Sequence, residues 1–314
     1  MSDYLGDTEN QKPVNTWKLG TGVDHQQMGN TWSGDKDIVS LSLSGDMNIF
    51  DQRVGDKPAR VLGVSFFLPP GAQTALLTSF RQATQKSITS IASSGTDTFL
   101  AGNADGRVLW FSPSSSESIN LQGTGHSNLV SGLAPSPNGD TVFSTGYDDR
   151  VREIQVNGST SEFLQVFICL GFVMGHLYAT LVCFSSTALS TAAQPRSVAV
   201  TEDGTVFVAE VGNVEAFRAN QRVLHEVPKY QPSAMAGSRN FVAIGGEVSG
   251  IFDDQIFAYS QNPQDQKVRL AQWDGISLKD LGVLEGNKGV ISALAFSPDG
   301  NLLASGDVRI LVEQ

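Results

Sequence analysis

The sequence predicts an all-β protein with the architecture of a β-propeller, in which four-stranded blades repeat around a ring. One strand–turn–strand pattern recurs along the chain, its strands are short and apolar, and the copies lie about 40–45 residues apart. The composition agrees, because charged residues make up only 17% of the chain and glycine accounts for 32 of its 314 residues. Such a balance suits many short strands joined by tight turns. A β-sandwich would give similar strands without so long a period.

Each copy of the repeat has a short apolar strand, a turn rich in Gly, Asp, Asn and Ser, a second apolar strand ending in small residues, another turn and a third strand. In the last copy, the strand at 290–296 is followed by the turn Ser-Pro-Asp-Gly at 297–300 and by a strand at 301–307. Asp-Gly and Asn-Gly pairs supply the positive φ that a tight hairpin needs. The other copies cover residues 28–50, 88–111, 129–154 and 196–217, with a fainter one from Ser233.

The spacing of the inner turns locates three insertions. Successive turns, measured between Gly34, Gly95, Gly139, Gly204, Asn240 and Gly300, are 61, 44, 65, 36 and 60 residues apart. Three of these intervals exceed one repeat by roughly 20 residues. The predicted organisation is a polar N-terminal segment at 1–14, an incomplete propeller at 15–307 and an off-pattern tail at 308–314, with insertions near 63–82, 166–190 and 248–264.

The insertions can be interpreted as retained introns, as genuine loops or, for the second, as a membrane segment. Val64, Val166, Val248 and Val308 lie near the off-pattern starts, and an intron beginning GT in frame would encode valine; the mature transcript tests this. Residues 163–184 are apolar enough to be a transmembrane candidate. Against a span, the flanks lack a Lys/Arg bias, and a span would divide one repeat array across a membrane.

The net charge of −11 and the isoelectric point near 4.7 argue against nucleic acid or an anionic membrane as the main partner. The two cysteines make no metal or disulfide framework, so a reducing compartment is expected. The N-terminal residues are polar, so no signal peptide is expected there.

Several residues match the structural positions of WD repeats. Gly125-His126 is typical of the entry to a WD-repeat blade, and Asp148 is the expected turn partner of His126. Asp105 and Asp265 are interpreted as equivalent turn carboxylates. Trp110 and Trp273 stand near the ends of outer strands, where packing between blades is expected.

The sequence predicts no catalytic, metal or cofactor site and therefore no enzyme. The histidines fall in separate units, the turn carboxylates are too far apart for a calcium loop, and no phosphate-binding loop follows a strand. Exposed aromatic and basic residues near loops or strand ends are candidates for contact with a partner protein: Trp32, Tyr147, Arg150 and Arg152.

With the blades located, the chain resembles the C-terminal propeller of the actin-interacting protein 1 family, WD-repeat partners of cofilin. The resemblance extends from about Trp17 to Asp307 and fails in the three insertions. The residues that carry it are the stretches 23–29 (Val-Asp-His-Gln-Gln-Met-Gly), 38–46, 86–91, 125–128, 144–149 and 284–289.

The resemblance implies a cytoplasmic protein of the actin cytoskeleton that binds actin filaments and, with cofilin, promotes their disassembly. Family members carry two propellers of seven blades, whereas about five and a half blades are counted here. The ring is therefore expected to stay open, with two exposed sheet edges. The alternatives are a generic WD-repeat scaffold for another protein partner and a non-functional truncated product.

Overall fold

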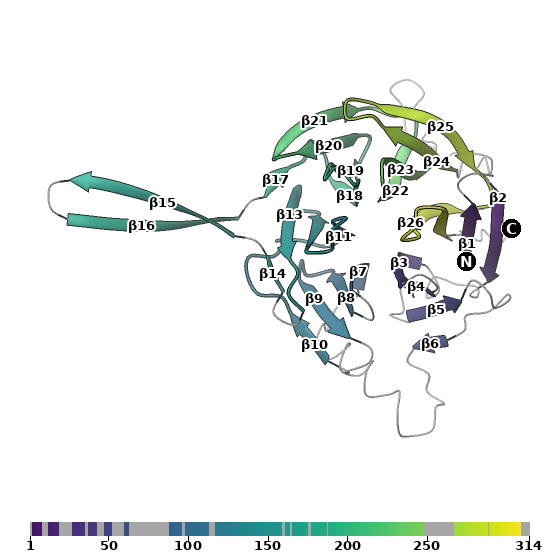
Figure 1. Ribbon diagram of the computed structural model, residues 1–314, viewed down its shortest axis with the longest axis horizontal. Helices are drawn as coiled ribbons and strands as arrows, with labels where there is room; N and C mark the ends of the chain where they lie inside the picture. The colour runs from purple at the N-terminus through teal and green to yellow at the C-terminus, as the bar shows by residue number, and fades with distance from the viewer. Residues whose placement is uncertain are drawn as a thin grey trace, which may run out of the picture.

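The protein is described here from a computed structural model. The described residues are 2–7, 12–18, 27–34, 37–42, 47–51, 60–62, 88–95, 98–112, 117–158, 161–163, 165–174, 177–186, 188–247, 267–287 and 289–308. Within these ranges the secondary structure consists of β-strands and turns, so the predicted all-β class is confirmed. Figure 1 shows the strands arranged as the blades of a propeller.

Five blades are built from consecutive antiparallel strands. Each innermost strand is followed outward by the next three along the chain, and neighbouring strands pair in antiparallel fashion. The first blade comprises β3 (Gln27–Ser33), β4 (Asp37–Ser42), β5 (Met47–Asp51) and β6 (Arg60–Leu62). The second comprises β7 (Ile88–Gly95), β8 (Thr98–Asn103), β9 (Val108–Ser112) and β10 (Glu117–Asn120).

The third blade comprises β11 (Val130–Pro135), β12 (Thr141–Gly146), β13 (Arg150–Gln155) and β14 (Glu162–Phe163), and β17 (Leu189–Ser190) also pairs with β13. The fourth comprises β18 (Pro195–Val200), β19 (Val206–Glu210), β20 (Val214–Arg218) and β21 (Gln221–Glu226). The fifth comprises β22 (Gln231–Ser238), β23 (Phe241–Glu247), β24 (Val268–Trp273) and β25 (Leu278–Leu284).

A sixth blade combines the two ends of the described chain. Its inner strands are β26 (Val290–Phe296) and β27 (Leu302–Val308), and its outer strands are β1 (Ser2–Asp7) and β2 (Lys12–Lys18). β1 pairs with β27 in antiparallel register, with Tyr4 opposite Ser305. Trp17, from β2, is buried with its ring 5.0 Å from that of Phe50 in the first blade.

The pairing of β1 with β27 joins the two ends of the ring, which the sequence analysis expected to stay open at about five and a half of seven blades. The inner strands β3, β7, β11, β18, β22 and β26 lie side by side in that order, and β26 is again next to β3. The described residues thus give six blades (Figure 1). The number of blades predicted from the sequence is half a blade lower because residues 2–7 are assigned there to a polar N-terminal segment. These residues form β1, which pairs with β27 at the other end of the chain.

The middle strands of the blades are buried on both faces, which explains their nearly continuous apolar sequences. All five residues of β9 and of β19 are buried, since each blade is covered by a neighbour on either side. The hydrophobic clusters combine strands of adjacent blades. The core is therefore a series of interfaces between blades.

The second predicted insertion contains β15 (Gln165–Met174) and β16 (Leu177–Ser186), which pair with each other in a two-stranded sheet. Figure 1 shows this hairpin projecting away from the ring. The insertions near 63–82 and 248–264, and residues 309–314 of the predicted tail, lie outside the described residues. In the part of the chain that the structure describes, no helix is long and apolar enough to cross a membrane. The domain boundaries remain a prediction.

A disulfide can trap the pairing that closes the ring. With Tyr4→Cys and Ser305→Cys in a chain whose two native cysteines are serine, oxidation should link the strands, because directly opposite residues have Cα separations that suit a disulfide. Mass spectrometry of a proteolytic digest should find the cross-linked peptide in the monomer. Either single variant is the control. Linkage only between separate chains would contradict the closed ring.

Candidate functional site

In the described part of the chain, the connectors between blades and the turns between second and third strands lie at one end of the ring, here called the connector end. The connector from the second to the third blade, residues 121–129, contains His126, which is 6% exposed. Its Nδ1 lies 2.7 Å from Oδ1 of Asp148, in the β12–β13 turn, and its Nε2 lies 2.9 Å from the Ser144 hydroxyl. The Ser127 amide donates to the other Asp148 oxygen at 3.1 Å. These bonds attach the connector to the blade that follows it.

The pKa shifts determine how the protons are placed. Burial lowers the pKa of His126 more than the Asp148 hydrogen bond raises it, so the imidazole is neutral near pH 7. Burial alone would raise the pKa of Asp148, but the hydrogen bonds from His126 and from the Ser127 amide outweigh it and hold that pKa below its usual value. His126 therefore donates from Nδ1 to the carboxylate, and Nε2 accepts from Ser144.

The same connector is also held by the blade that precedes it. The Asn103 side-chain oxygen accepts hydrogen bonds from the amides of Asp105 (3.0 Å) and Arg107 (2.9 Å), which shapes the β8–β9 turn. The His126 amide donates to the Gly106 carbonyl at 3.0 Å. A Cβ on Gly106 would lie 2.2 Å from the His126 carbonyl oxygen, so this approach requires glycine.

In the fourth blade a pair of buried glutamates takes the corresponding place. Glu210 ends β19 and Glu215 is the second residue of β20, and both are 0% exposed. The amides of the preceding connector donate to them, Ala193 to Glu210 at 2.9 Å and Ala192 to Glu215 at 3.2 Å. Two carboxyl groups thus anchor the connector from the third blade.

The two glutamates have different protonation states, since the pKa of Glu210 is raised and that of Glu215 is lowered. Burial, together with the hydrogen bond and charge of Glu215, raises the pKa of Glu210 to about 8, so Glu210 is protonated at neutral pH. For Glu215 the hydrogen bonds from Glu210, Arg222 and His225 outweigh burial and lower the pKa. Arg222 Nη1 lies 2.7 Å and His225 Nδ1 3.0 Å from Glu215 Oε1.

The two tryptophans proposed to pack between blades lie at such interfaces. Trp110 is buried on β9 among residues of the third blade that include Val142. Trp273 on β24 packs edge-on against Phe207 of the fourth blade, with ring centroids 5.1 Å apart. The Trp273 indole NH donates to Asp203 at 3.2 Å.

The turn carboxylates that were grouped with Asp148 differ in their surroundings. Asp105 is exposed, and its turn is organised through the Asn103 side chain. Asp265 lies outside the described residues. Among the described residues, Asp148 is therefore the one of these three aspartates that is hydrogen-bonded to a histidine.

The four candidate contact residues separate into two kinds. Trp32 is only 5% exposed and its indole NH donates to the Ala295 carbonyl of the sixth blade at 3.2 Å, so it is largely occupied by an interface between blades. Arg152 is half-buried, with Nη2 3.6 Å from Asp148 Oδ2. Tyr147 is 37% exposed and Arg150 is exposed and donates to the Ser190 hydroxyl. Of the four candidates, Tyr147 and Arg150 are thus the ones whose side chains are exposed to solvent at the connector end.

Sequence reasoning missed the glutamate pair. The available signal was a departure from the repeat, because the second strand of a copy ends in small residues and β19 ends in Glu210, at the position that Gly146 occupies in β12. Among the described residues no group of three or more His, Cys, Asp or Glu is placed to hold a metal ion.

Comparisons with known proteins agree with this architecture. The family described as "WD domain, G-beta repeat" matches residues 119–153 and 278–308. The solved chain described as "Structure of U3-55K" aligns with a TM-score of 0.56 at 15% identity, over 93% of this chain and 98% of that one. This likeness supports the propeller fold.

Curated relatives match nearly the whole chain. WD repeat-containing protein 1-B of Xenopus laevis is 27% identical over 98% of this chain, and actin-interacting protein 1 of Drosophila melanogaster is 24% identical over 97%. The 66 kDa stress protein of Physarum polycephalum is 25% identical over 94%. These matches cover 42%, 40% and 39% of the relatives, so the chain spans about two fifths of their length. The chain is thus similar to WD-repeat proteins, among them actin-interacting protein 1.

Proposed function

We propose that this chain is an actin-binding interaction module that works with cofilin to promote the disassembly of actin filaments. The observation that carries the proposal is its similarity, over 97% of its length, to a protein named for its interaction with actin. The cofilin partnership, the cytoplasmic location and the absence of enzymatic activity belong to the same proposal, through the family that the sequence resembles.

The connector end offers a suitable contact surface. Tyr147 and Arg150 are exposed on either side of the turn that the His126–Asp148 bond holds in place. Tyrosine and arginine are enriched among the residues that dominate binding energy in protein interfaces. A rigid turn that presents such residues loses little conformational entropy when a partner binds.

Co-sedimentation with actin filaments, with and without cofilin, tests the function. The chain should pellet with filaments, more completely when cofilin is present, and should increase filament severing seen by fluorescence microscopy. Absence of both effects would overturn the proposal and leave the generic WD-repeat scaffold.

A charge reversal tests the surface. Arg150→Glu combined with Tyr147→Ala should weaken the affinity for actin filaments, measured by co-sedimentation, by about tenfold or more. A tenfold loss corresponds to about 1.4 kcal/mol of binding free energy. Arg239→Glu is the matched control, because Arg239 is an exposed arginine in a turn at the other end of the ring. Equal loss in both variants would refute a contact at the connector end.

A further inference from the structure

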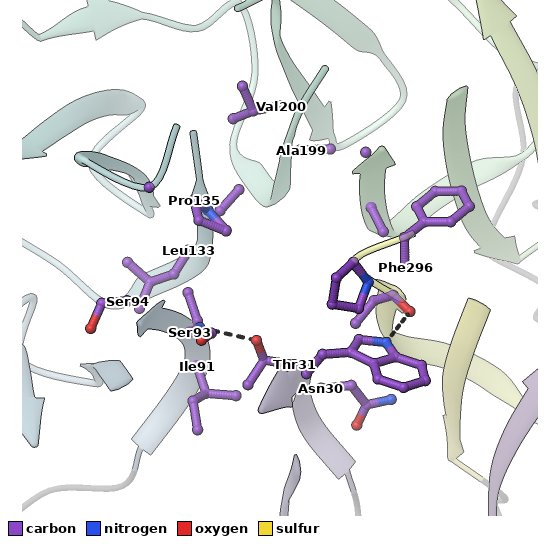
Figure 2. Close-up of a pocket in the computed structure, with 18 of the residues that line it drawn as sticks. Asn30, Thr31, Ile91, Ser93, Ser94, Leu133, Pro135, Ala199, Val200 and Phe296 are labelled. Atoms are coloured by element: carbon purple, nitrogen blue, oxygen red, sulfur yellow. Dashed lines mark hydrogen bonds between the residues drawn. The ribbon is translucent and has the colours of Figure 1, made fainter. Parts of the chain in front are cut away.

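A cavity of about 630 Å³ opens at the end of the ring opposite the connectors. All six inner strands contribute to its wall near the point where each enters its first hairpin turn, for example through Thr31, Ser93, Leu133, Val200 and Phe296. Figure 2 shows these side chains gathered around the cavity. Its volume lies within the range of about 300–1,000 Å³ that is usual for ligand sites. We call it the hairpin-end cavity.

The wall of the hairpin-end cavity is uncharged and largely apolar. None of the residues that line it is Asp, Glu, Lys or Arg. Several of its polar groups are already paired within the wall: the Ser93 amide donates to the Thr31 hydroxyl at 3.0 Å, and the Trp32 indole donates to the Ala295 carbonyl (Figure 2). An occupant therefore gains mainly from burying an apolar group.

The inner strands also leave backbone groups available around the cavity. β3, β7, β11, β18, β22 and β26 are each the terminal strand of their sheet, so one edge of each has no neighbouring strand within the described structure. Such an edge presents amide and carbonyl groups that can bind a polypeptide backbone. The Ser93 and Met235 amides on these edges are already bonded to side chains of neighbouring blades, so a ligand would use the other edge groups. A segment of polypeptide can use these groups, whereas a purely apolar small molecule cannot.

The turns around the mouth are acidic. The described residues in and directly after the first hairpin turns include five acids, Asp37, Asp140, Glu202, Asp203 and Asp299, and one base, Arg239, so their formal charge is −4. Arg218 Nη1 lies 3.5 Å from Asp203, so the other four acids carry the rim charge that is left for a ligand. The acids belong to four different blades, which distributes the charge around the mouth. A ring of like charge attracts cationic segments and repels a second copy of this chain, whose net charge is −11.

We propose that the hairpin-end cavity binds a basic segment of a partner protein, with one apolar side chain inserted into the cavity and flanking lysines or arginines at the acidic rim. The uncharged wall of the cavity favours an apolar side chain, and the acidic rim favours flanking basic residues. The free edges of the inner strands favour a ligand that has a polypeptide backbone. The site lies at the opposite end of the ring from Tyr147 and Arg150 and does not depend on the proposed contact with actin.

The probe is a short capped fluorescent peptide with one central phenylalanine and two lysines on each side, titrated with the full chain and followed by fluorescence anisotropy. Binding should saturate, and it should weaken about tenfold or more when the phenylalanine becomes serine or when the lysines become glutamates. It should also weaken at high salt, because the rim charges are exposed. Equal binding of the acidic peptide, or no binding of the basic one, would overturn the proposal.

Variants of the chain locate the site. Glu202→Lys reverses one rim charge and should weaken the peptide several-fold, whereas Glu226→Lys makes the same change on the outer strand β21, next to the connector end, and should leave binding unchanged. Ser93→Phe should block binding by filling the cavity. If Ser93→Phe lowers the melting temperature, the two glutamate variants still decide the location. Equal weakening by both glutamate variants would refute the site. Neither actin nor cofilin is present, so the outcome is separate from that of the co-sedimentation experiment.

Discussion

Replacing Asp148 with alanine should lower the free energy of unfolding by about 2–4 kcal/mol. The Asp148 side chain is 7% exposed and accepts hydrogen bonds from the buried His126 ring and from the Ser127 amide, while the Arg152 guanidinium lies nearby. Its removal leaves these donors inside the protein without their acceptor, and it releases the connector between the second and third blades. Urea unfolding followed by tryptophan fluorescence measures the loss.

Asp105→Ala is the matched control for Asp148→Ala. Both residues lie in the turn between the second and third strands of a blade, but Asp105 is exposed, so this variant should lose less than about 0.5 kcal/mol. Equal losses would mean that the His126 bond contributes nothing beyond the turn itself.

A glycine in the same network gives an independent check. Gly146→Ala would place a Cβ 2.4 Å from His126 Nδ1 and 2.9 Å from Asp148 Oδ1, which displaces the pair without removing either group. The double variant Gly146→Ala, Asp148→Ala should therefore lose less than the sum of the single losses, since both act on one interaction. Strict additivity would show that the two residues act separately.

Replacing Glu210 with glutamine should make the protein more stable at pH 8, by on the order of 2 kcal/mol, and should leave it almost unchanged near pH 5. Glu210 is protonated in the folded state up to about pH 8, whereas an unfolded glutamate loses its proton near pH 4.3. Between these values the folded chain binds more protons than the unfolded chain, so the stability of the natural chain falls as the pH rises. Glutamine does not titrate and removes this loss.

Melting temperatures measured from pH 5 to pH 8.5 test the role of Glu210. Glu215, Arg222 and His225 share the site and are the same in both proteins, so the difference between the two curves isolates Glu210. Glu226→Gln, at an exposed position on β21, is the control and should reproduce the natural curve. A Glu210→Gln curve parallel to the natural one would contradict a protonated, buried Glu210.

Much of the His126 site could be predicted from the sequence because its determinants are local. Gly125, His126, Ser144 and Asp148 fall within one repeat, and the hairpins on both sides of β12 bring their ends together without help from the rest of the chain. The glutamate pair could not be predicted in the same way. Whether Glu210 is buried, and which amides it accepts from, depends on how the connector from another blade crosses the end of β19.

Trp32 and β1 also make contacts that could not be predicted from the sequence, because their partners lie far away along the chain. Trp32 was interpreted as a contact residue because it lies near a strand end, but its indole is bonded to Ala295, 263 residues away in sequence. The N-terminal residues were interpreted as a polar segment, and they form an outer strand of the last blade. Neither partner has any signature in the neighbouring sequence.

The sequence by itself determined that this protein is an all-β propeller, because strand length, turn residues and repeat spacing are local properties repeated many times. It also predicted the His126–Asp148 bond and the packing of Trp110 and Trp273 between blades, because these residues stand at recognisable places in their own repeats. Only the tertiary structure decided the closure through β1 and β27, the protonated Glu210 and the acidic mouth of the hairpin-end cavity. Each of these depends on groups brought together from different blades, and the position of one blade against the next is set by packing around the whole ring.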